Sequence, residues 1–328
     1  MSVPQTVEYI PRVDADLDAC LPAALRGPTT TIAKIAAGLS GAGVYRVDAN
    51  GRSYVLKIAG PRDAVDGWRA RTAMLRAAAD AGVAPAVVHV DDQRRAVVTE
   101  LVVDRSFVAR LAQPSTRDAA IGELGAALRR VHALPLPDGA VASRDPRAFL
   151  DEIWTGLRGF PLPAWTGDVV RRVLDEPPPP AERAPVLSHN DPNPSNLVYD
   201  GARLLLLDWD NAGANDPFND LAAVAVFLRM DDATCAQLIA AHDEAPVAAS
   251  LPVCFVYLRR AIAALCGAMF LHVARVSGHA GARGDETFEL APTLGDVHGN
   301  MRAGTLSART PDGQWAFGQA LLKASAQL

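Results

Sequence analysis

The sequence predicts an α+β protein in which a small, mainly β part precedes a larger helical part. In residues 1–101, short apolar runs with the alternation of strands are separated by glycine turns and accompanied by one amphipathic stretch. Beyond about Val102 the apolar residues recur at helical spacing instead. The 328 residues are enough for two lobes, at roughly 150 residues per domain. We therefore expect one lobe over residues 1–101 and a second over residues 102–328.

The first lobe is expected to contain five strands, mostly antiparallel, and one helix. The turn at residues 49–51, Ala-Asn-Gly, predicts a hairpin, because Asn and Gly tolerate the positive φ of tight turns. In the following strand Lys57 lies on the opposite face from Leu56 and Ile58. Gly82 is expected to end the helix. The expected strands cover residues 29–35, 44–47, 53–58, 87–90 and 96–101, and the expected helix covers residues 63–81.

The second lobe is expected to be mostly helical. The proline run at residues 177–180 is typical of a surface linker. The segment after Val276 is rich in glycine and is expected to consist mainly of loops. The expected helices cover residues 117–132, 145–157, 221–230, 234–242, 252–276 and 314–326.

Composition excludes several classes of function. The net charge of −5 argues against nonspecific nucleic-acid binding, which requires clustered Lys and Arg. The apolar stretch at residues 261–271 is too short to span a membrane and is expected to be a buried helix. Residues 1–16 lack the features of a signal peptide. The four cysteines lack the spacing of a metal site and fit reduced thiols, so we expect a cytoplasmic protein.

One short segment contains the residue types that phosphoryl transfer requires. His189, Asp191 and Asn196 lie in a single run, and a short apolar stretch after it ends in Asp208, Trp209 and Asp210. Transfer from ATP needs a carboxylate that orients the acceptor hydroxyl, and an amide oxygen and a second carboxylate that hold magnesium on the phosphates. The pattern predicts Asp191 as the catalytic base, and Asn196 and Asp208 as ligands of Mg²⁺.

This segment resembles the catalytic loop of the aminoglycoside phosphotransferase and choline/ethanolamine kinase family. The family pattern is roughly His-Gly/Asn-Asp, four variable residues, Asn, and then Ile-Asp-Trp-Glu/Asp. Asn190 and the Asp-Trp-Asp ending favour the choline kinase side of the family. Residues 98–101, 128–134 and 215–222 also resemble the family, so the resemblance covers roughly residues 30–275. It implies a protein-kinase-like fold, with a nucleotide-binding first lobe, a catalytic and acceptor-binding second lobe, and ATP and Mg²⁺ as cofactors.

The resemblance also implies the remaining parts of a nucleotide site. A glycine-rich loop would cover the phosphates, Lys57 would bind them, and the end of the fifth strand would be the hinge between the lobes. Taken singly, such a loop is more often an ordinary hairpin turn, and Lys57 could equally be a solvated lysine. Their order before the catalytic loop favours the nucleotide site. The residues implied in nucleotide binding are Gly38, Ser40, Gly41, Gly43, Lys57, Glu100 and Leu101.

Three further residues have supporting roles in this interpretation. His189 is counted with the catalytic residues, but in this family it shapes the loop and does not transfer protons. Asp220 is expected to brace the loop by accepting backbone hydrogen bonds. Asp210 could support the metal or face the acceptor, and a solvated acid is an equally good interpretation.

One departure from the family pattern concerns the partner of Lys57. The family pairs this lysine with a glutamate on the following helix. Here no glutamate occurs between Lys57 and Glu100, and Arg71 stands about where it is expected. Either Asp66 partners the lysine, or the lysine is held in some other way, or nucleotide binding is impaired.

The acceptor is the least determined part of the prediction. In residues 185–245 the acids outnumber the arginines, which favours a cationic alcohol such as choline or ethanolamine. Trp154, Trp165 and Trp209 could offer faces to an ammonium group, although a tryptophan is more often core packing. The glycine-rich segment after Val276 is a candidate for closing over the acceptor.

The sequence thus favours an ATP- and Mg²⁺-dependent small-molecule kinase that acts on a hydroxyl. A first alternative is a regulatory module that binds nucleotide without turnover, suggested by the missing helix glutamate. A second is an aminoglycoside-type antibiotic phosphotransferase. A nucleotide-sugar glycosyltransferase that uses Asp208 and Asp210 leaves residues 189–196 unexplained.

Overall fold

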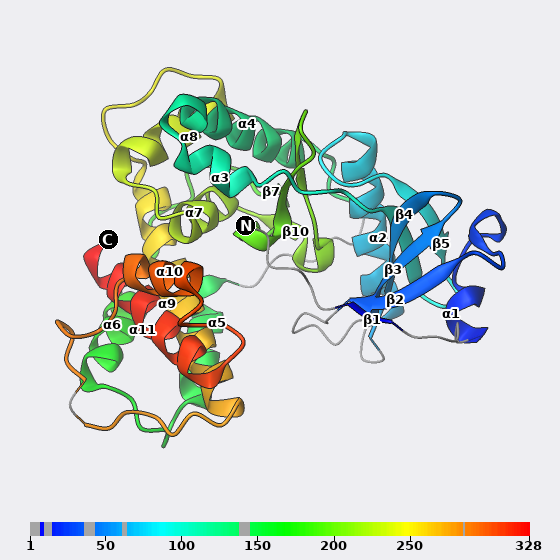
Figure 1. Cartoon of the computed structure of the whole chain (residues 1–328). Coiled ribbons are helices and arrows are strands. Elements are labelled where there is room, and N and C mark those ends of the chain that lie inside the picture. The colour runs from blue at the N-terminus through cyan, green and yellow to red at the C-terminus, as the bar shows by residue number, and fades with distance from the viewer. Residues whose placement is uncertain (1–6, 10–14, 36–42, 61–63, 138–144, 285) are drawn as a thin grey trace. The chain divides into compact units, whose positions relative to one another are not determined.

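The chain is an α+β protein, with an antiparallel sheet in its N-terminal part and helices in its C-terminal part (Figure 1). The computed structural model describes residues 7–9, 15–35, 43–60, 64–137, 145–284 and 286–328. The chain divides into two compact units. The first contains residues 1–141, 186–214 and 241–245, and the second contains residues 142–185, 215–240 and 246–328. The lobe boundary between residues 101 and 102 stays a prediction.

The first unit contains a six-stranded antiparallel sheet. The five predicted strands are confirmed, and a sixth, short strand precedes them at the edge of the sheet. Asn50 and Gly51 have φ values of 53° and 74°, so the predicted tight hairpin forms. In sheet order the strands are β1 (Val7–Tyr9), β2 (Thr31–Ile35), β3 (Gly43–Ala49), β4 (Arg52–Ile58), β6 (Ala96–Glu100) and β5 (Val87–Asp91).

One face of this sheet packs on the first unit's apolar core. Tyr54 and Leu56 of β4 are buried there, and Ile58 packs against the same cluster. The cluster includes Leu21 and other residues of α1 (Ala15–Ala19), η1 (Ala23–Leu25) and the segment between them. Since successive side chains of a strand point to opposite faces, Lys57 projects away from this core. Helix α2 (Val65–Asp80) follows the sheet's first strands, and Gly82, with φ of 70°, ends it as predicted.

The rest of the first unit carries the predicted catalytic segment. Two helices, α3 (Phe107–Ala112) and α4 (Pro114–His132), pack against each other, and α4 contacts the short strands that flank the segment. Of these strands, β8 and β9 form an antiparallel hairpin and β7 pairs with β10. In chain order the short elements are β7 (Val186–Ser188), η2 (Pro194–Asn196), β8 (Leu197–Tyr199), β9 (Leu204–Leu206), η3 (Trp209–Asn211) and β10 (Gly213–Asn215).

Gly125 is expected to be irreplaceable at its place in α4. A Cβ atom there would lie 2.7 Å from the Cβ of Ala241 and 2.8 Å from the backbone nitrogen of His242. We expect Gly125→Ala to lower the free energy of unfolding by about 1–3 kcal/mol through overpacking. Gly122→Ala is the matched control, because a Cβ at Gly122 meets no atom within 4 Å.

The control should stabilise α4 by about 0.5–1 kcal/mol, because alanine favours the helix interior over glycine. Urea unfolding followed by circular dichroism measures both changes. Equal effects of the two substitutions would contradict the close approach at Gly125.

The second unit is helical. Six of its helices enclose two apolar clusters, and α9 contributes to both. All five helices predicted for this part of the chain are confirmed, and α6 and α10 were missed. The helices are α5 (Pro146–Gly156), α6 (Ala164–Asp175), α7 (Pro217–Phe227), α8 (Asp232–Asp243, whose last residues belong to the first unit), α9 (Val253–Val276), α10 (Leu294–Ala303) and α11 (Pro311–Gln327).

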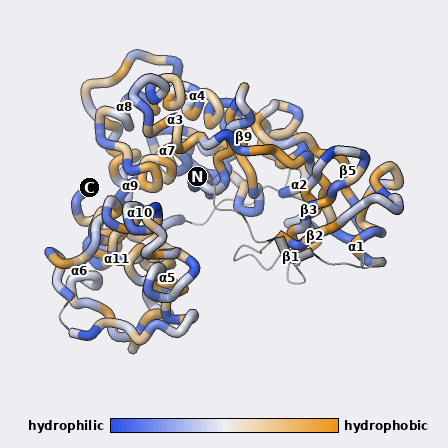
Figure 2. The backbone as a smooth tube through the Cα atoms, in the orientation of Figure 1, coloured by the Kyte–Doolittle hydropathy of each residue, from blue (hydrophilic) through white to orange (hydrophobic). Residues whose placement is uncertain are grey.

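Helix α9 corrects an expectation from the sequence. The apolar stretch at residues 261–271 is too short for a membrane span, but the helix that contains it has 24 residues and a window of mean hydropathy 1.6. By length and composition it could therefore cross a membrane. Of that window, 56% is buried inside the protein, where α5, α7 and α11 pack against it. Figure 2 shows the apolar course of α7 and α9, which is typical of core helices.

Candidate active site

The hairpin of β8 and β9 brings the two predicted metal ligands to the same end. Leu197 pairs with Leu206, and the Leu207 N–H donates a 2.8 Å hydrogen bond to the carbonyl of Asn196. Asn196 therefore lies directly before the first strand and Asp208 two residues after the end of the second. Two residues twelve positions apart in the sequence become neighbours by strand register alone.

His189 joins the predicted catalytic loop to this end of the hairpin. Its buried Nε2 lies 2.8 Å from the carbonyl of Leu207, and its Nδ1 lies 3.3 Å from the backbone N–H of Asp191. The carbonyl can only accept and the N–H can only donate, so Nε2 carries the ring proton and Nδ1 accepts. The ring also packs edge-on against Trp209. Contacts at both ring nitrogens fit the loop-shaping role that the family resemblance implies for His189.

Asn190 makes the second connection between the loop and the segment after β9. Its φ of 64° is a left-handed conformation, which asparagine tolerates better than most residues. Its side-chain amide donates a 2.9 Å hydrogen bond to the carbonyl of Asn211 in η3. The contacts of His189 and Asn190 thus fix the course of the backbone just before Asp191.

The carboxylate of Asp191 is oriented by two amides. Asn193 Nδ2 donates to Oδ1 at 2.9 Å, and Asn196 Nδ2 lies 3.4 Å from Oδ2 and 2.9 Å from the Asp191 carbonyl. The sequence pattern missed Asn193. Its side-chain oxygen also accepts from the backbone of Ser195, the kind of local turn that asparagine before a proline favours. Asp191 is half-buried and held as an acceptor, which suits a residue that orients a hydroxyl.

Lys57 lies between two carboxylates. Its Nζ is 2.6 Å from Asp208 Oδ1 and 2.7 Å from Asp210 Oδ2. Asp208 has φ of 60°, and this left-handed residue begins the turn η3 that brings the two acids to the same ammonium group. Burial lowers the pKa of Lys57, but the charges of Asp210 and Asp208 outweigh it, so that the pKa is above its usual value. The lysine is therefore fully protonated at neutral pH.

These contacts decide between the alternatives for the missing helix glutamate. Asp66, the candidate partner on α2, is exposed. Among the described residues, the carboxylates in contact with Lys57 are those of Asp208 and Asp210. The lysine is held in another way than by the helix.

The glycine-rich loop can be followed only at its end. Gly38, Ser40 and Gly41 lie outside the described residues. Gly43 is the first residue of β3, and the strand register places Val44 opposite Lys57. The loop therefore returns to the sheet beside the strand that carries the lysine.

The predicted hinge residues are engaged within the sheet. Glu100 forms an ion pair with Arg52 at 2.5 Å, and its N–H donates to the Ala86 carbonyl. The N–H of Leu101 donates to the carbonyl of Ser53. These two N–H groups are used by the sheet, so a nucleotide would have to contact other groups of this segment.

The oxygen atoms near Lys57 fit magnesium. Asp208 and Asp210 already converge on one cation, the ammonium of Lys57. Asn196, at the same end of the hairpin, uses its Nδ2 toward Asp191, and its Oδ1 accepts no hydrogen bond from the described residues. Magnesium prefers such carboxylate and amide oxygens and completes its shell with water and phosphate. The described residues contain no cluster of three or more His, Cys, Asp or Glu suited to a metal, so phosphate oxygens would be part of the set.

Of the remaining candidates, Asp220 and Trp209 are buried and Trp154 and Trp165 are partly buried. Asp220 is completely buried in α7, where a carboxylate requires partners, and the loop that it braces stays a prediction. Trp209 is buried too, and its Nε1 donates to the carbonyl of Leu206. Trp165 packs edge-on against Phe288. Trp154 and Trp165 both pack against one apolar cluster of the second unit. These tryptophans act as core residues, which was the commoner interpretation.

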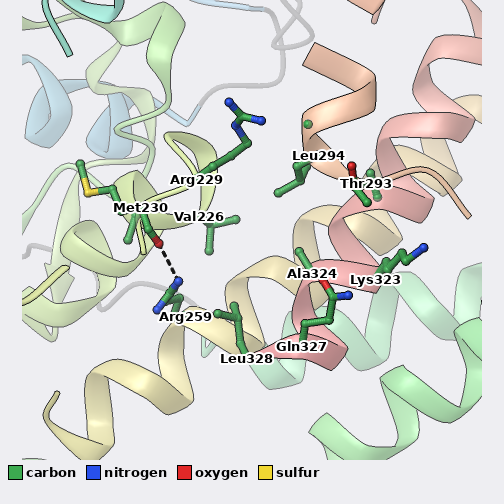
Figure 3. A pocket seen from close by; sticks show the side chains of 13 residues that line it. Val226, Arg229, Met230, Arg259, Thr293, Leu294, Lys323, Ala324, Gln327 and Leu328 are labelled. Carbon is green, nitrogen blue, oxygen red and sulfur yellow. Dashed lines mark hydrogen bonds between the residues drawn. The ribbon is translucent and has the colours of Figure 1, made fainter. Parts of the chain in front are cut away.

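A separate cavity of about 260 Å³ lies in the second unit, between α7, α9, α10 and α11 (Figure 3). Val226, Leu294 and Leu328 form part of its apolar wall. Arg259 lines one side, where it donates to the Met230 carbonyl and pairs with Asp232. No residue predicted from the sequence as a site residue lines this cavity.

The comparison with family models gives one match. Residues 31–247, about two thirds of the chain, match the model of the phosphotransferase enzyme family. No curated protein matches the sequence.

Solved structures with the same fold include kinases of different specificity. A choline/ethanolamine kinase family protein from Mesorhizobium loti is 21% identical, with a TM-score of 0.59 over 93% of this chain and 96% of the other. Choline kinase LicA from Streptococcus pneumoniae is 15% identical, with a TM-score of 0.55 over 74% and 84%, and LicA has also been solved with AMP. The macrolide 2′-phosphotransferase MphH from Brachybacterium faecium is 16% identical, with a TM-score of 0.54 over 92% and 96%. At these identities the similarity establishes the fold.

Proposed function

The chain belongs to the phosphotransferase enzyme family, and from this premise we propose that it transfers the γ-phosphate of ATP to a hydroxyl group of a small molecule, with Mg²⁺ as cofactor. The observation that carries the proposal is how four residues come together. One end of the hairpin holds Asn196 and Asp208, and Lys57 pairs with Asp208. His189 joins the loop that contains Asp191 to the same end. A phosphate-binding cation, two oxygen ligands for a metal and an oriented carboxylate are what phosphoryl transfer requires.

In the proposed reaction each residue has a separate task. Lys57 would bind the phosphate oxygens, and Asp208 and Asn196 would hold the metal. Magnesium, when bound, neutralises the charge of the phosphates. Asp191 orients the acceptor hydroxyl and takes its proton while the oxygen–phosphorus bond forms and the bond to the ADP oxygen breaks. His189 keeps the loop in place.

For the acceptor we propose an amino alcohol of the choline or ethanolamine class. Asn190 and the ending Asp208-Trp209-Asp210 support this choice, as does the acidic character of residues 185–245. The three candidate tryptophans give it no support, because they pack against other residues of the protein. An antibiotic hydroxyl is the second candidate, since MphH, a macrolide 2′-phosphotransferase, shares the fold.

The regulatory alternative loses its main argument. It was suggested by the absence of a helix glutamate, but Lys57 is held by two other carboxylates. A cytoplasmic location stays part of the proposal.

The test is ADP release by the purified protein with ATP and Mg²⁺, measured by a coupled assay over a panel of acceptors. The panel contains choline, ethanolamine, thiamine, homoserine, sugars and aminoglycosides. We expect turnover with one acceptor class, and mass spectrometry should show that acceptor with one phosphate added. ATP binding with no turnover on any hydroxyl compound would favour the regulatory module, and a protein that does not bind ATP would overturn the proposal.

A further inference from the structure

The partner of Lys57 does not come from helix α2. The helix contains two acids, Asp66 and Asp80, and both are exposed. It also contains three arginines, so its own charge is positive. A lysine directed at this helix would meet like charge instead of a carboxylate. The lysine must be oriented by residues from elsewhere in the first unit.

The two acids that contact Lys57 differ in their relation to the proposed metal site. Asp208 lies at the end of the hairpin beside Asn196, in the position of a metal ligand. A carboxylate that coordinates a divalent cation is less able to hold an ammonium group at the same time, since each cation weakens the attraction of the other. Asp210, two residues later, is 2.7 Å from Nζ through its Oδ2. It is the carboxylate that remains for the lysine once the metal site is used.

We propose that Asp210 is the positioning residue of Lys57 and takes the role that a helix carboxylate would otherwise fill. The inference rests on the proposed function, because it assigns Lys57 to the phosphates. It gives Asp210 a role different from the three that the sequence left open, which were metal support, contact with the acceptor and a solvated acid.

The turn that carries Asp210 is suited to a fixed anchor. Trp209, between the two acids, is buried, donates through Nε1 to the Leu206 carbonyl and packs against His189. Asn190 holds the other end of the turn through the Asn211 carbonyl. The turn that carries Asp210 and the catalytic loop are thus held by the same contacts. A backbone that is already fixed lowers the entropy lost when Asp210 pairs with the lysine.

The first experiment uses the small number of lysines. The chain contains Lys34, Lys57 and Lys323. Lys34 is exposed and Lys323 is buried, so Lys34 serves as an internal reference. Limited acetylation with acetic anhydride, followed by peptide mass spectrometry, gives the rate at Lys57 relative to Lys34.

Asp210→Asn should raise this ratio several-fold, because the amine loses the carboxylate ion pair that covers it. Asp210→Glu should largely restore the ratio of the unchanged protein. Asp66→Asn is the matched control on α2 and should leave it unchanged. An unchanged ratio in Asp210→Asn, or an equal rise in Asp66→Asn, would overturn the inference.

The second experiment separates positioning from metal binding. Asp210→Asn is expected to weaken the affinity for MgADP about tenfold, which corresponds to about 1.4 kcal/mol. In the background Lys57→Met the same change should have little further effect, because a residue that acts through Lys57 has nothing left to position. Titration calorimetry measures the four affinities. A full effect of Asp210→Asn without Lys57 would identify a metal ligand and refute the positioning role.

The two proposals fail in different ways. The acetylation ratio can be measured without turnover. If the acetylation ratios and ADP affinities are as expected but no acceptor is phosphorylated, only the proposed function is refuted. If the protein releases ADP with an acceptor but the acetylation rate of Lys57 does not depend on Asp210, only the inference about Asp210 is refuted.

Discussion

Replacement of Asp191 by asparagine is expected to lower phosphoryl transfer about 10³-fold, within the range of about 10²–10⁴ typical of a positioned general base. The amide cannot accept the proton of the acceptor. It also presents an N–H₂ group where Asn193 and Asn196 now donate to two carboxylate oxygens. ATP affinity should stay within about twofold, since a base contributes to the transition state and little to ground-state binding.

ADP release under saturating acceptor measures the first quantity, and titration calorimetry with a non-hydrolysed ATP analogue measures the second. Asp200→Asn is the matched control. Asp200 accepts from Ala202 and Arg203 in the exposed turn between β8 and β9, at the other end of the hairpin. The assignment is wrong if Asp191→Asn retains more than about a tenth of the activity while Asp200→Asn behaves identically.

Replacement of Asp208 by asparagine is expected to remove most of the magnesium dependence of nucleotide binding. A metal ion contributes several kcal/mol by neutralising phosphate charge, so turnover should fall about 10²–10³-fold. Lys57 keeps its ion pair with Asp210 in this variant, so its acetylation relative to Lys34 should rise less than in Asp210→Asn. The variant should therefore lose the metal effect and keep the lysine in place.

ADP affinity with and without Mg²⁺ shows whether this is so. In the unchanged protein Mg²⁺ should strengthen ADP binding, and in Asp208→Asn the two affinities should be nearly equal. Asp210→Asn serves as the comparison, because it should weaken binding in a manner that depends on Lys57. A magnesium effect of normal size in Asp208→Asn would exclude Asp208 as a ligand.

The sheet could be predicted from the sequence because its signals are local. Alternation in β4 and the Asn50-Gly51 turn depend only on neighbouring residues, and both predictions are confirmed. Helix boundaries were less accurate. Helix α7 begins four residues before the predicted start at Leu221, because Asp216 caps it and Pro217 takes the first position.

The missed helix α10 shows where composition misled the prediction. Its surroundings are rich in glycine, which suggested loops. The capping box of Thr293 and Asp296 and the left-handed Gly304 mark its two ends, and both signals are present in the sequence. The helix α6 lacks a side-chain N-cap, so its start carried no such signal.

Most residues of the candidate site could be predicted from the sequence, but the ion pairs of Lys57 could not. The loop from His189 to Asn196 is contiguous, so residue types and order were enough to identify it. The ion pair of Lys57 with Asp208 joins residues 151 positions apart. Such a pair depends on how the sheet and the hairpin pack, and no local pattern specifies it. The family pattern pointed to α2 for the partner, where this chain has arginines.

The ion pair of Lys57 has a consequence for the design of inhibitors. An acylating compound aimed at this lysine would find less neutral amine than at a free lysine, because the two acids keep its pKa above the ordinary value. Asp208 and Asp210 themselves form a receptor that already binds an ammonium group. A compound that carries its own cation into that receptor would displace the lysine from both acids and block the proposed metal ligand Asp208, without any covalent reaction.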